Sequence, residues 1–286
     1  RYTKGIHPKE LQMADLAYFD EAQYLPSPRR ATEYKNTVLA GRKRMKDKTL
    51  VIGGLARNIA PVLGRTMARI ERTGSMFKDY RVVLFENDSR DNTSEQLQAW
   101  AKVNPNVHVI SEKLNDPINP GVRCLNRATR MAKYRNACRE YIAEHWPDFD
   151  NVMIVDTDLP GGWSYDGIAN TFGQDLHWDF VGSNGIIYKE YNGILDKALY
   201  YDAWAFRWYG SWSPVFARQV NPRNWMRGEP LLRVNSCFGG MALYRTECML
   251  AGQYDGTDCE HVPFHRRLAE LGFDQGFLNP SQIVCY

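Results

Sequence analysis

The feature that most constrains this chain is an alternation of short apolar segments with amphipathic stretches in its first half. β-prone segments rich in Val, Ile and Leu occur at 49–55, 80–85, 106–111 and 151–155. Stretches with the periodicity of a helix lie between them, at 62–73, 94–103 and 123–145. Strands that alternate with helices in this way build a mostly parallel sheet with helices on both faces. The sequence therefore predicts an α/β fold.

We expect one continuous domain, because 286 residues can bury a single large core. An N-terminal extension at 1–48 precedes the alternating pattern, and a helix is predicted within it at 8–21. The first half of the domain spans 49–162. The second half, 163–286, is richer in tryptophan and in irregular segments that contain proline and glycine.

Charge and hydropathy argue against two classes of function. The net charge is +3 and the charged fraction is 24%, so no strong field draws this chain to nucleic acid. The one basic run, at 42–48, is expected to be a solvated approach to the first strand, with a membrane surface or a phosphate-rich acceptor as the alternative. No apolar stretch approaches the roughly 18 residues needed to cross a bilayer. We therefore expect neither a nucleic-acid partner nor a transmembrane segment.

Cysteines and glycosylation sequons bear on the cellular compartment. The six cysteines contain no CxxC pair, so neither a zinc site nor a disulfide framework is expected. Sequons begin at Asn87 and Asn92, in a polar loop where a glycan would obstruct ligand binding. This slightly favours the cytoplasm over the Golgi lumen and leaves the compartment open.

The sharper of two polar clusters is Asp156-Thr157-Asp158, which directly follows the apolar strand at 151–155. In a parallel sheet, ligands bind at the edge where the carboxyl ends of strands meet. Two carboxylates held at a strand end suit a hard cation such as Mg²⁺ or Mn²⁺, which can bind a diphosphate and stabilise the charge of a leaving group. Two aspartates in isolation more often only begin a turn.

The second cluster, Glu86–Thr93, ends the strand at 80–85. Its carboxylates and amides can hydrogen-bond a ribose and the edge of a base. Alone it would be an ordinary loop with helix caps, since Asp91 and its neighbours are good N-cap residues. Together, the two clusters predict a nucleotide site at one edge of the sheet.

The two loops resemble those of a known family. VLFENDSRDNT is similar to the nucleotide-binding loop of inverting family-two glycosyltransferases, and VMIVDTDLPGG is similar to their strand that ends in the DxD motif. The segments GGLARN, RMAKYRN, YYDAWAFR and EHVPFH are most similar to the capsule-associated mannosyltransferases of fungi and their bacterial relatives. The resemblance covers about residues 49 to 275.

This resemblance implies a GT-A fold, which is Rossmann-like, and a metal-dependent glycosyltransferase. The cofactor would be Mn²⁺ or Mg²⁺. The first half would bind a nucleoside-diphosphate sugar, with GDP-mannose as the leading donor. The second half would bind a saccharide or glycoconjugate that offers a hydroxyl group to the sugar.

The resemblance also implies roles for single residues. The nucleotide-sugar would be bound by Arg57, Glu86, Asp88, Arg135 and Asp156. The metal would be held by Asp156, Asp158 and His261. Glu260, or less readily Asp258 or His261, would take the proton of the acceptor hydroxyl if the enzyme inverts the anomeric centre.

One departure leaves the stereochemistry open. Family-two enzymes usually have Glu-Asp where this chain has Glu260-His261. If the configuration is retained, no dedicated base is needed, and His261 or His265 could complete the metal site.

Tryptophans of the second half are candidates for acceptor binding. Trp204 and Trp208 are predicted to contact the acceptor, because aromatic rings bind the apolar faces of sugars. Their spacing of about one helical turn favours core packing as the alternative.

Two other functions compete. A sugar-phosphate nucleotidyltransferase would need a glycine-rich basic phosphate loop after the first strand, of which GGLARNIAP is a poor version. A non-catalytic carbohydrate-binding domain would bind sugars without a divalent ion.

Overall fold

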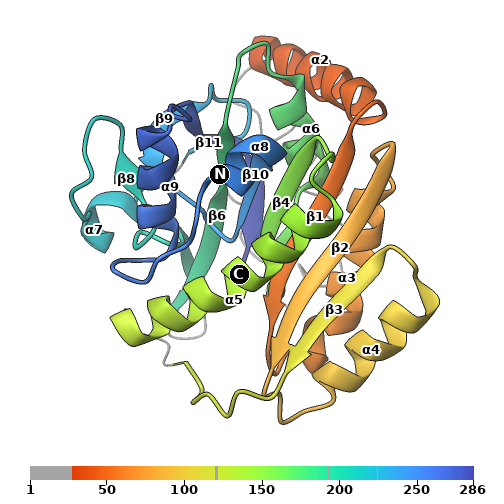
Figure 1. Cartoon of the computed structure of the whole chain (residues 1–286). Helices are drawn as coiled ribbons and strands as arrows, with labels where there is room; N and C mark the ends of the chain where they lie inside the picture. Colours follow the sequence, from red (N-terminus) through yellow and green to blue (C-terminus); the bar gives the residue numbers. More distant parts are fainter. Residues whose placement is uncertain (1–27, 120–121, 192–193, 224) are drawn as a thin grey trace.

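The computed structural model describes residues 28–119, 122–191, 194–223 and 225–286 (Figure 1). The helix predicted at 8–21 lies outside the described residues. Within the described ranges, none of the helices combines the length and the apolar character that a membrane crossing requires. All six cysteines are free.

The first half of the domain forms the predicted parallel sheet. Its strands are β1 (Thr49–Ala56), β2 (Asp79–Asn87), β3 (Val107–Glu112) and β4 (Asn151–Asp156). They pair in the order β3-β2-β1-β4, and each pairing is parallel. The connecting helices are α3 (Ala60–Gly74), α4 (Thr93–Val103) and α5 (Leu125–His145). Every element predicted in this half is present, with ends that differ from the prediction by no more than two residues.

The second half extends the same sheet. Beyond β4 the order continues β10-β6-β11-β9-β8, with β5 beside β11 and β7 beside β6. The strands are β5 (Gly162–Trp163), β6 (Phe180–Tyr191), β7 (Ile194–Tyr200), β8 (Arg207–Trp208), β9 (Leu232–Ser236), β10 (Met241–Arg245) and β11 (Gly276–Cys285). The helices are α6 (Tyr165–Gly173), α7 (Ala217–Val220), α8 (Thr246–Ala251) and α9 (His261–Glu270).

Strand direction follows the prediction. Strand β10 is antiparallel to both β4 and β6, so β6 runs in the direction of β4, and β11 is parallel to β6. The central strands therefore run mostly in one direction, with β10 as the exception among them. The predicted α/β domain with a mostly parallel central sheet flanked by helices is confirmed.

Both faces of the sheet are apolar and covered. Along β1, Val51 belongs to one buried cluster, whereas Leu50 and Ile52 belong to the other, as expected because successive side chains of a strand point to opposite faces. Helix α5 packs on the first face, with Ile142 buried there, and α3 packs on the second, with Leu63 buried there. Figure 1 shows α5 across the near face and α3 behind it.

A helix that the sequence did not predict, α2 (Pro28–Met45), lies in the predicted N-terminal extension and packs on α6. Glycines permit the close approach. A Cβ added at Gly41 would lie 1.7 Å from the backbone oxygen of Ala169, and one added at Gly173 would lie 1.9 Å from that of Thr37.

The basic run at 42–48 follows from this packing. It ends α2 and begins the turn to β1. The side chains of Arg42, Arg44 and Lys48 are about half exposed, but they pair with Asp166, Asp175 and Asp150, respectively. The run is thus exposed, as expected, and part of it fixes α2 to the domain.

The contact of α2 with α6 leads to a stability prediction. We expect Gly41→Ala to lower the free energy of unfolding by about 2–3 kcal/mol, because the added methyl group would collide with the α6 backbone. Gly64→Ala, inside α3, is the matched control: its Cβ would meet no atom within 4 Å, so we expect a gain of up to about 1 kcal/mol. Urea unfolding of both variants tests this. Effects of the same sign and size would contradict it.

Candidate functional site

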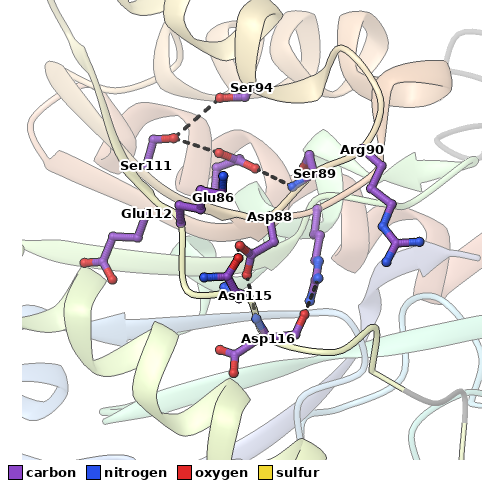
Figure 2. Close-up of a pocket in the computed structure, with 11 residues that line it drawn as sticks. Glu86, Asp88, Ser89, Arg90, Ser94, Ser111, Glu112, Asn115 and Asp116 are labelled. Atoms are coloured by element: carbon purple, nitrogen blue, oxygen red, sulfur yellow. Dashed lines mark hydrogen bonds between the residues drawn. The ribbon is translucent and has the colours of Figure 1, made fainter.

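The predicted nucleotide loop begins where β2 ends. Asp88 has φ 53°, in the left-handed region that Asp and Asn adopt more readily than most residues. Just before it, Glu86 is buried and accepts hydrogen bonds from the backbone N of Ser89 (3.0 Å) and the hydroxyl of Ser111 (2.7 Å). Glu86 therefore fixes the loop and joins the ends of β2 and β3 (Figure 2).

Asp88 and Arg57 hold the segment after β3. The two carboxylate oxygens of Asp88 accept from the backbone N of Asn115 (2.8 Å) and of Asp116 (3.0 Å). Desolvation opposes the charge on Asp88, but these hydrogen bonds outweigh it and lower its pKa. Arg57 donates to the backbone oxygens of Asp116 (2.7 Å) and Pro117 (2.9 Å).

These contacts enclose a polar cavity of about 580 Å³, which we call the loop cavity. Arg57, Glu86 and Asp88 all line it, together with Ser111 and Glu112 of β3 (Figure 2). The structure thus brings together, in one cavity, three residues predicted to bind the nucleotide.

The DxD segment follows β4 at the same sheet edge. Thr157 is buried and donates to the backbone oxygen of Leu55, which fixes the segment against β1. Asp156 is about a quarter exposed and Asp158 is exposed. Desolvation by surrounding protein atoms and the negative charge of Asp156 raise the pKa of Asp158 to about 6. The two aspartates are therefore close enough to interact electrostatically.

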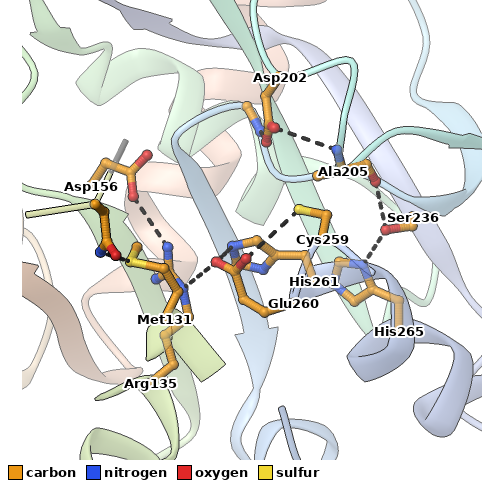
Figure 3. A network of polar contacts seen from close by, with 12 residues as sticks. Met131, Arg135, Asp156, Asp202, Ala205, Ser236, Cys259, Glu260, His261 and His265 are labelled. Carbon is orange, nitrogen blue, oxygen red and sulfur yellow. Dashed lines mark hydrogen bonds and ion pairs between the residues drawn. The ribbon is translucent and has the colours of Figure 1, made fainter. Parts of the chain in front are cut away.

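Arg135 of α5 connects Asp156 to Glu260. Its Nη2 lies 3.2 Å from Oδ1 of Asp156, and its Nε lies 3.0 Å from Oε1 of Glu260 (Figure 3). The Arg135 side chain is 4% exposed and lies over the ring of Phe238. Burial opposes its charge, but the charges of Glu260 and Asp156 outweigh burial and raise its pKa. Arg135 thus keeps two carboxylates in place.

His261 is buried beside this network, at 2% exposure. Its ring stacks on Phe238, with centroids 3.9 Å apart. Its Nε2 lies 3.5 Å from Oε1 of Glu260, and among the described residues neither ring nitrogen has a hydrogen-bond partner. Burial and the charge of Arg135 hold its pKa well below the usual value, so the imidazole is neutral. A neutral imidazole with a nitrogen that is not hydrogen-bonded, such as Nδ1 here, is the form that binds metal ions.

His265 differs. Its Nδ1 lies 2.8 Å from the hydroxyl of Ser236 and its Nε2 lies 3.0 Å from that of Tyr244. Burial lowers its pKa to about 3. Because both nitrogens are engaged, the alternative in which His265 completes a metal site does not fit this structure.

A second cavity, of about 320 Å³, is lined in part by Asp156, and we call it the arginine cavity. Predicted site residues line it: Arg135, Asp156, Trp204, Glu260 and His261. Asp258 and Trp208 are not part of its lining. Asp258 pairs with the buried Arg207, and Trp208 packs against Phe206.

The predicted metal ligands do not form a closed site by themselves. In the described part of the chain, no group of three or more His, Cys, Asp or Glu side chains is arranged to hold a metal ion. Asp156 and His261 line the same cavity, and the exposed Asp158 is coupled to Asp156. These residues fit a site in which a bound diphosphate supplies further oxygen ligands.

Two residues at or next to the arginine cavity were not predicted from the sequence to belong to the site. Asp202, at φ 75°, lines the cavity and accepts from the backbone N of Gly239 at 3.2 Å. Tyr286 donates to Oδ2 of Asp156 at 2.6 Å, and its ring packs against Tyr201. Neither follows a predicted strand, although Asp202 lies in the YYDAWAFR segment on which the resemblance rests.

The environment of Asp202 leads to a pH prediction. Burial, and then the charge of Asp156, raise its pKa from the ordinary value of 3.8 to about 7. A raised folded-state pKa gives stability that is present below about pH 4 and is lost as the pH rises through about 7. Since asparagine does not titrate, Asp202→Asn should gain stability relative to wild type between pH 5 and pH 8, by about 1–2 kcal/mol for this half-buried group.

Urea unfolding of both proteins at the two pH values measures this difference. Asp148→Asn, which changes an exposed carboxylate in the turn before β4, is the control. A difference between Asp202→Asn and wild type that is the same at both pH values would contradict the prediction.

Comparisons with known proteins concern the fold. No protein-family model and no curated protein matches the chain. Among solved structures it is similar to the mannosyltransferase PcManGT from Pyrobaculum calidifontis in complex with GDP-Man and Mn²⁺. The TM-score is 0.51 and the identity 13%, over 90% of this chain and 66% of that one. It is also similar to GalNAc-T7 with UDP, GalNAc and Mn²⁺, with a TM-score of 0.50 and an identity of 12%, over 84% of this chain and 44% of that one.

The chain therefore spans less than two thirds of the length of the proteins it resembles. The predicted GT-A fold is confirmed by this likeness.

Proposed function

We propose that this protein is a metal-dependent glycosyltransferase. It transfers a sugar from a nucleoside-diphosphate donor to a hydroxyl group of a saccharide or glycoconjugate. Mannose from GDP-mannose is the leading donor, which the sequence resemblance supports and which agrees with the ligand of PcManGT.

The observation that carries this proposal is a pair of cavities lined by residues at the carboxyl ends of two strands that flank β1: Glu86 of β2 lines the loop cavity and Asp156 of β4 lines the arginine cavity. The loop cavity, lined by Glu86 and Asp88, would take the nucleoside. The arginine cavity, lined by Trp204 and Glu260, would take the sugar and the acceptor. The diphosphate would lie between them, next to Asp156 and Asp158.

The metal ligands would be Asp156, Asp158 and His261, and the Nδ1 of buried His261, which has no hydrogen-bond partner among the described residues, supports this assignment. A divalent ion bound there would offset the charge of the diphosphate. Arg135 would orient Asp156 through its hydrogen bond to Oδ1. The residues of the cavity wall would exclude water from the donor sugar.

Glu260 is the proposed proton acceptor if the anomeric centre is inverted. Its Oε1 is engaged by Arg135, so Oε2, which lies near the thiol of Cys259, would receive the proton. Retention of configuration would need no such base. The anomeric configuration of the product formed from a donor of known configuration distinguishes inversion from retention.

Nucleotide binding tests the proposed function directly. We expect calorimetry with UDP, GDP and CMP to show that one nucleotide binds, with an affinity that Mn²⁺ increases. The matching nucleotide sugars should then release their nucleotide when the acceptor is a simple glycoside. If no nucleotide binds with or without Mn²⁺ while simple sugars do, the carbohydrate-binding alternative replaces this proposal.

A further inference from the structure

Two arginines at the start of α5 line the arginine cavity and have no role in the site described so far. Arg123 and Arg127 line its wall together with Met131 and Arg135. Arg127, Met131 and Arg135 recur at every fourth position of α5, a spacing that places neighbouring members on one face of the helix, whereas Arg123 lies just before the N-cap residue Cys124. The face of α5 that meets the cavity therefore carries the guanidinium groups of Arg127 and Arg135, and that of Arg123 lines the cavity just before the helix begins.

Arg123 and Arg127 differ from Arg135 in their partners. Arg135 is paired with both Asp156 and Glu260. In the described ranges, by contrast, the side chains of Arg123 and Arg127 form no ion pair and no hydrogen bond. Arg123 is exposed and Arg127 is partly buried, so both are accessible to a ligand. Arg135 itself retains a buried Nη1 without a partner.

The position of these charges is unfavourable for the helix alone. The N-terminus of a helix carries partial positive charge and is stabilised by anions. The first turn of α5 contains Arg127 and no acidic residue, and the side chain of its N-cap residue, Cys124, accepts no capping hydrogen bond. A bound anion would compensate both the arginines and the helix end.

The anion can be identified from the neighbours of Arg127. Arg127 lines the same cavity as Asp156, the first carboxylate of the DxD segment. Arg127 is therefore near the DxD segment, where the diphosphate lies under the proposed function.

We infer that Arg127, with Arg123 beside it, binds the terminal phosphate of the nucleoside diphosphate and stabilises it as the leaving group. This inference rests on the proposed function. In the transfer, the bond between the anomeric carbon and the phosphate oxygen breaks and its electron pair stays on that oxygen. The acceptor oxygen bonds to the anomeric carbon, and its proton passes to a carboxylate of the cavity or to the departing phosphate. The phosphate gains negative charge, so the guanidinium groups bind it more strongly after the bond breaks than before.

The experiment compares nucleoside diphosphates with monophosphates. Calorimetry of GDP against GMP, and of UDP against UMP, is done with and without Mn²⁺ on wild type, Arg127→Gln and Arg123→Gln. We expect Arg127→Gln to weaken binding of the diphosphate about tenfold, because a hydrogen-bonded charge pair is lost. The affinity for the monophosphate should change by no more than about twofold. Arg123→Gln should show the same selectivity with a smaller effect, because its side chain is more exposed.

Arg130→Gln is the matched control. Arg130 is on the same helix, but its Nε donates to the side-chain oxygen of Asn119, and it is not part of the cavity lining. It should leave both affinities unchanged. Without ligand, Arg127→Gln should unfold at a temperature no lower than wild type, since the substitution removes a cation from the first turn of α5.

Each outcome decides the inference. An unchanged diphosphate affinity in Arg127→Gln, or an equal loss for mono- and diphosphate, overturns it while the proposed function stands. If wild type binds no nucleotide at all, the proposed function fails as well, which distinguishes the two failures.

Discussion

Asp158→Ala is expected to abolish the Mn²⁺ dependence of nucleoside-diphosphate binding and to reduce sugar transfer at least about 100-fold. Removal of a direct metal ligand should cost at least as much as the 10–100-fold known for residues that only support such ligands. The side chain is exposed at the end of β4, so its removal should leave the fold intact. Calorimetry of the diphosphate with and without Mn²⁺ measures the first effect, and nucleotide release from the donor measures the second.

Asp148→Ala is the matched control for this substitution. Asp148 is an exposed carboxylate in the turn that precedes β4, at the opposite end of the strand from Asp158. Its loss should change neither quantity. If Asp158→Ala still binds the diphosphate with wild-type dependence on Mn²⁺, the assignment of Asp158 as a metal ligand is wrong.

Arg135→Met is expected to lower the free energy of unfolding by about 3–5 kcal/mol. Methionine fills a similar volume, but it leaves the carboxylates of Asp156 and Glu260 without their buried partner, and an uncompensated buried charge is strongly destabilising. Urea unfolding measures the loss. Adding Glu260→Gln to Arg135→Met should restore part of the lost free energy of unfolding, because it removes one of the two carboxylate charges that have lost their partner.

Arg139→Met provides the comparison on the same helix. Arg139 donates to a neutral backbone oxygen, that of Leu250, rather than to a carboxylate. Its replacement should cost about 1 kcal/mol. Equal losses for the two methionine variants would show that the Arg135 network contributes no more than a single neutral hydrogen bond.

The first half of the fold was predictable because its signals are local. Strand β4 is buried on both faces, so its residues form one continuous apolar run that sequence inspection detects. Helix α2 was missed for the opposite reason. Its stability depends on the close packing of Gly41 against Ala169, which is distant in the sequence. A local sequence pattern does not indicate such a contact.

The same distinction applies to the site. Glu86 and Asp88, like Asp156 and Asp158, are near neighbours at strand ends, and parallel strands bring such ends together. The contact between Arg135 and Glu260 joins α5 to the start of α9 and depends on the packing of the second half. The sequence places Trp204 and Trp208 about one helical turn apart, as if both were on one helix. The structure places Trp204 in a turn and Trp208 in β8, so only Trp204 reaches the cavity.

The place of β10 between β4 and β6 also bears on how the chain is made. During synthesis, β1 to β4 leave the ribosome first and can pair among themselves, but the free edge of β4 stays uncovered until β10 has been translated. An open strand edge is a template for association with other chains. Asp156 acquires its contact with Tyr286 later still, when β11 has been added. Nascent chains of this protein thus pass through a stage in which the edge of β4 is open to association, and the surroundings of Asp156 are completed only after that stage.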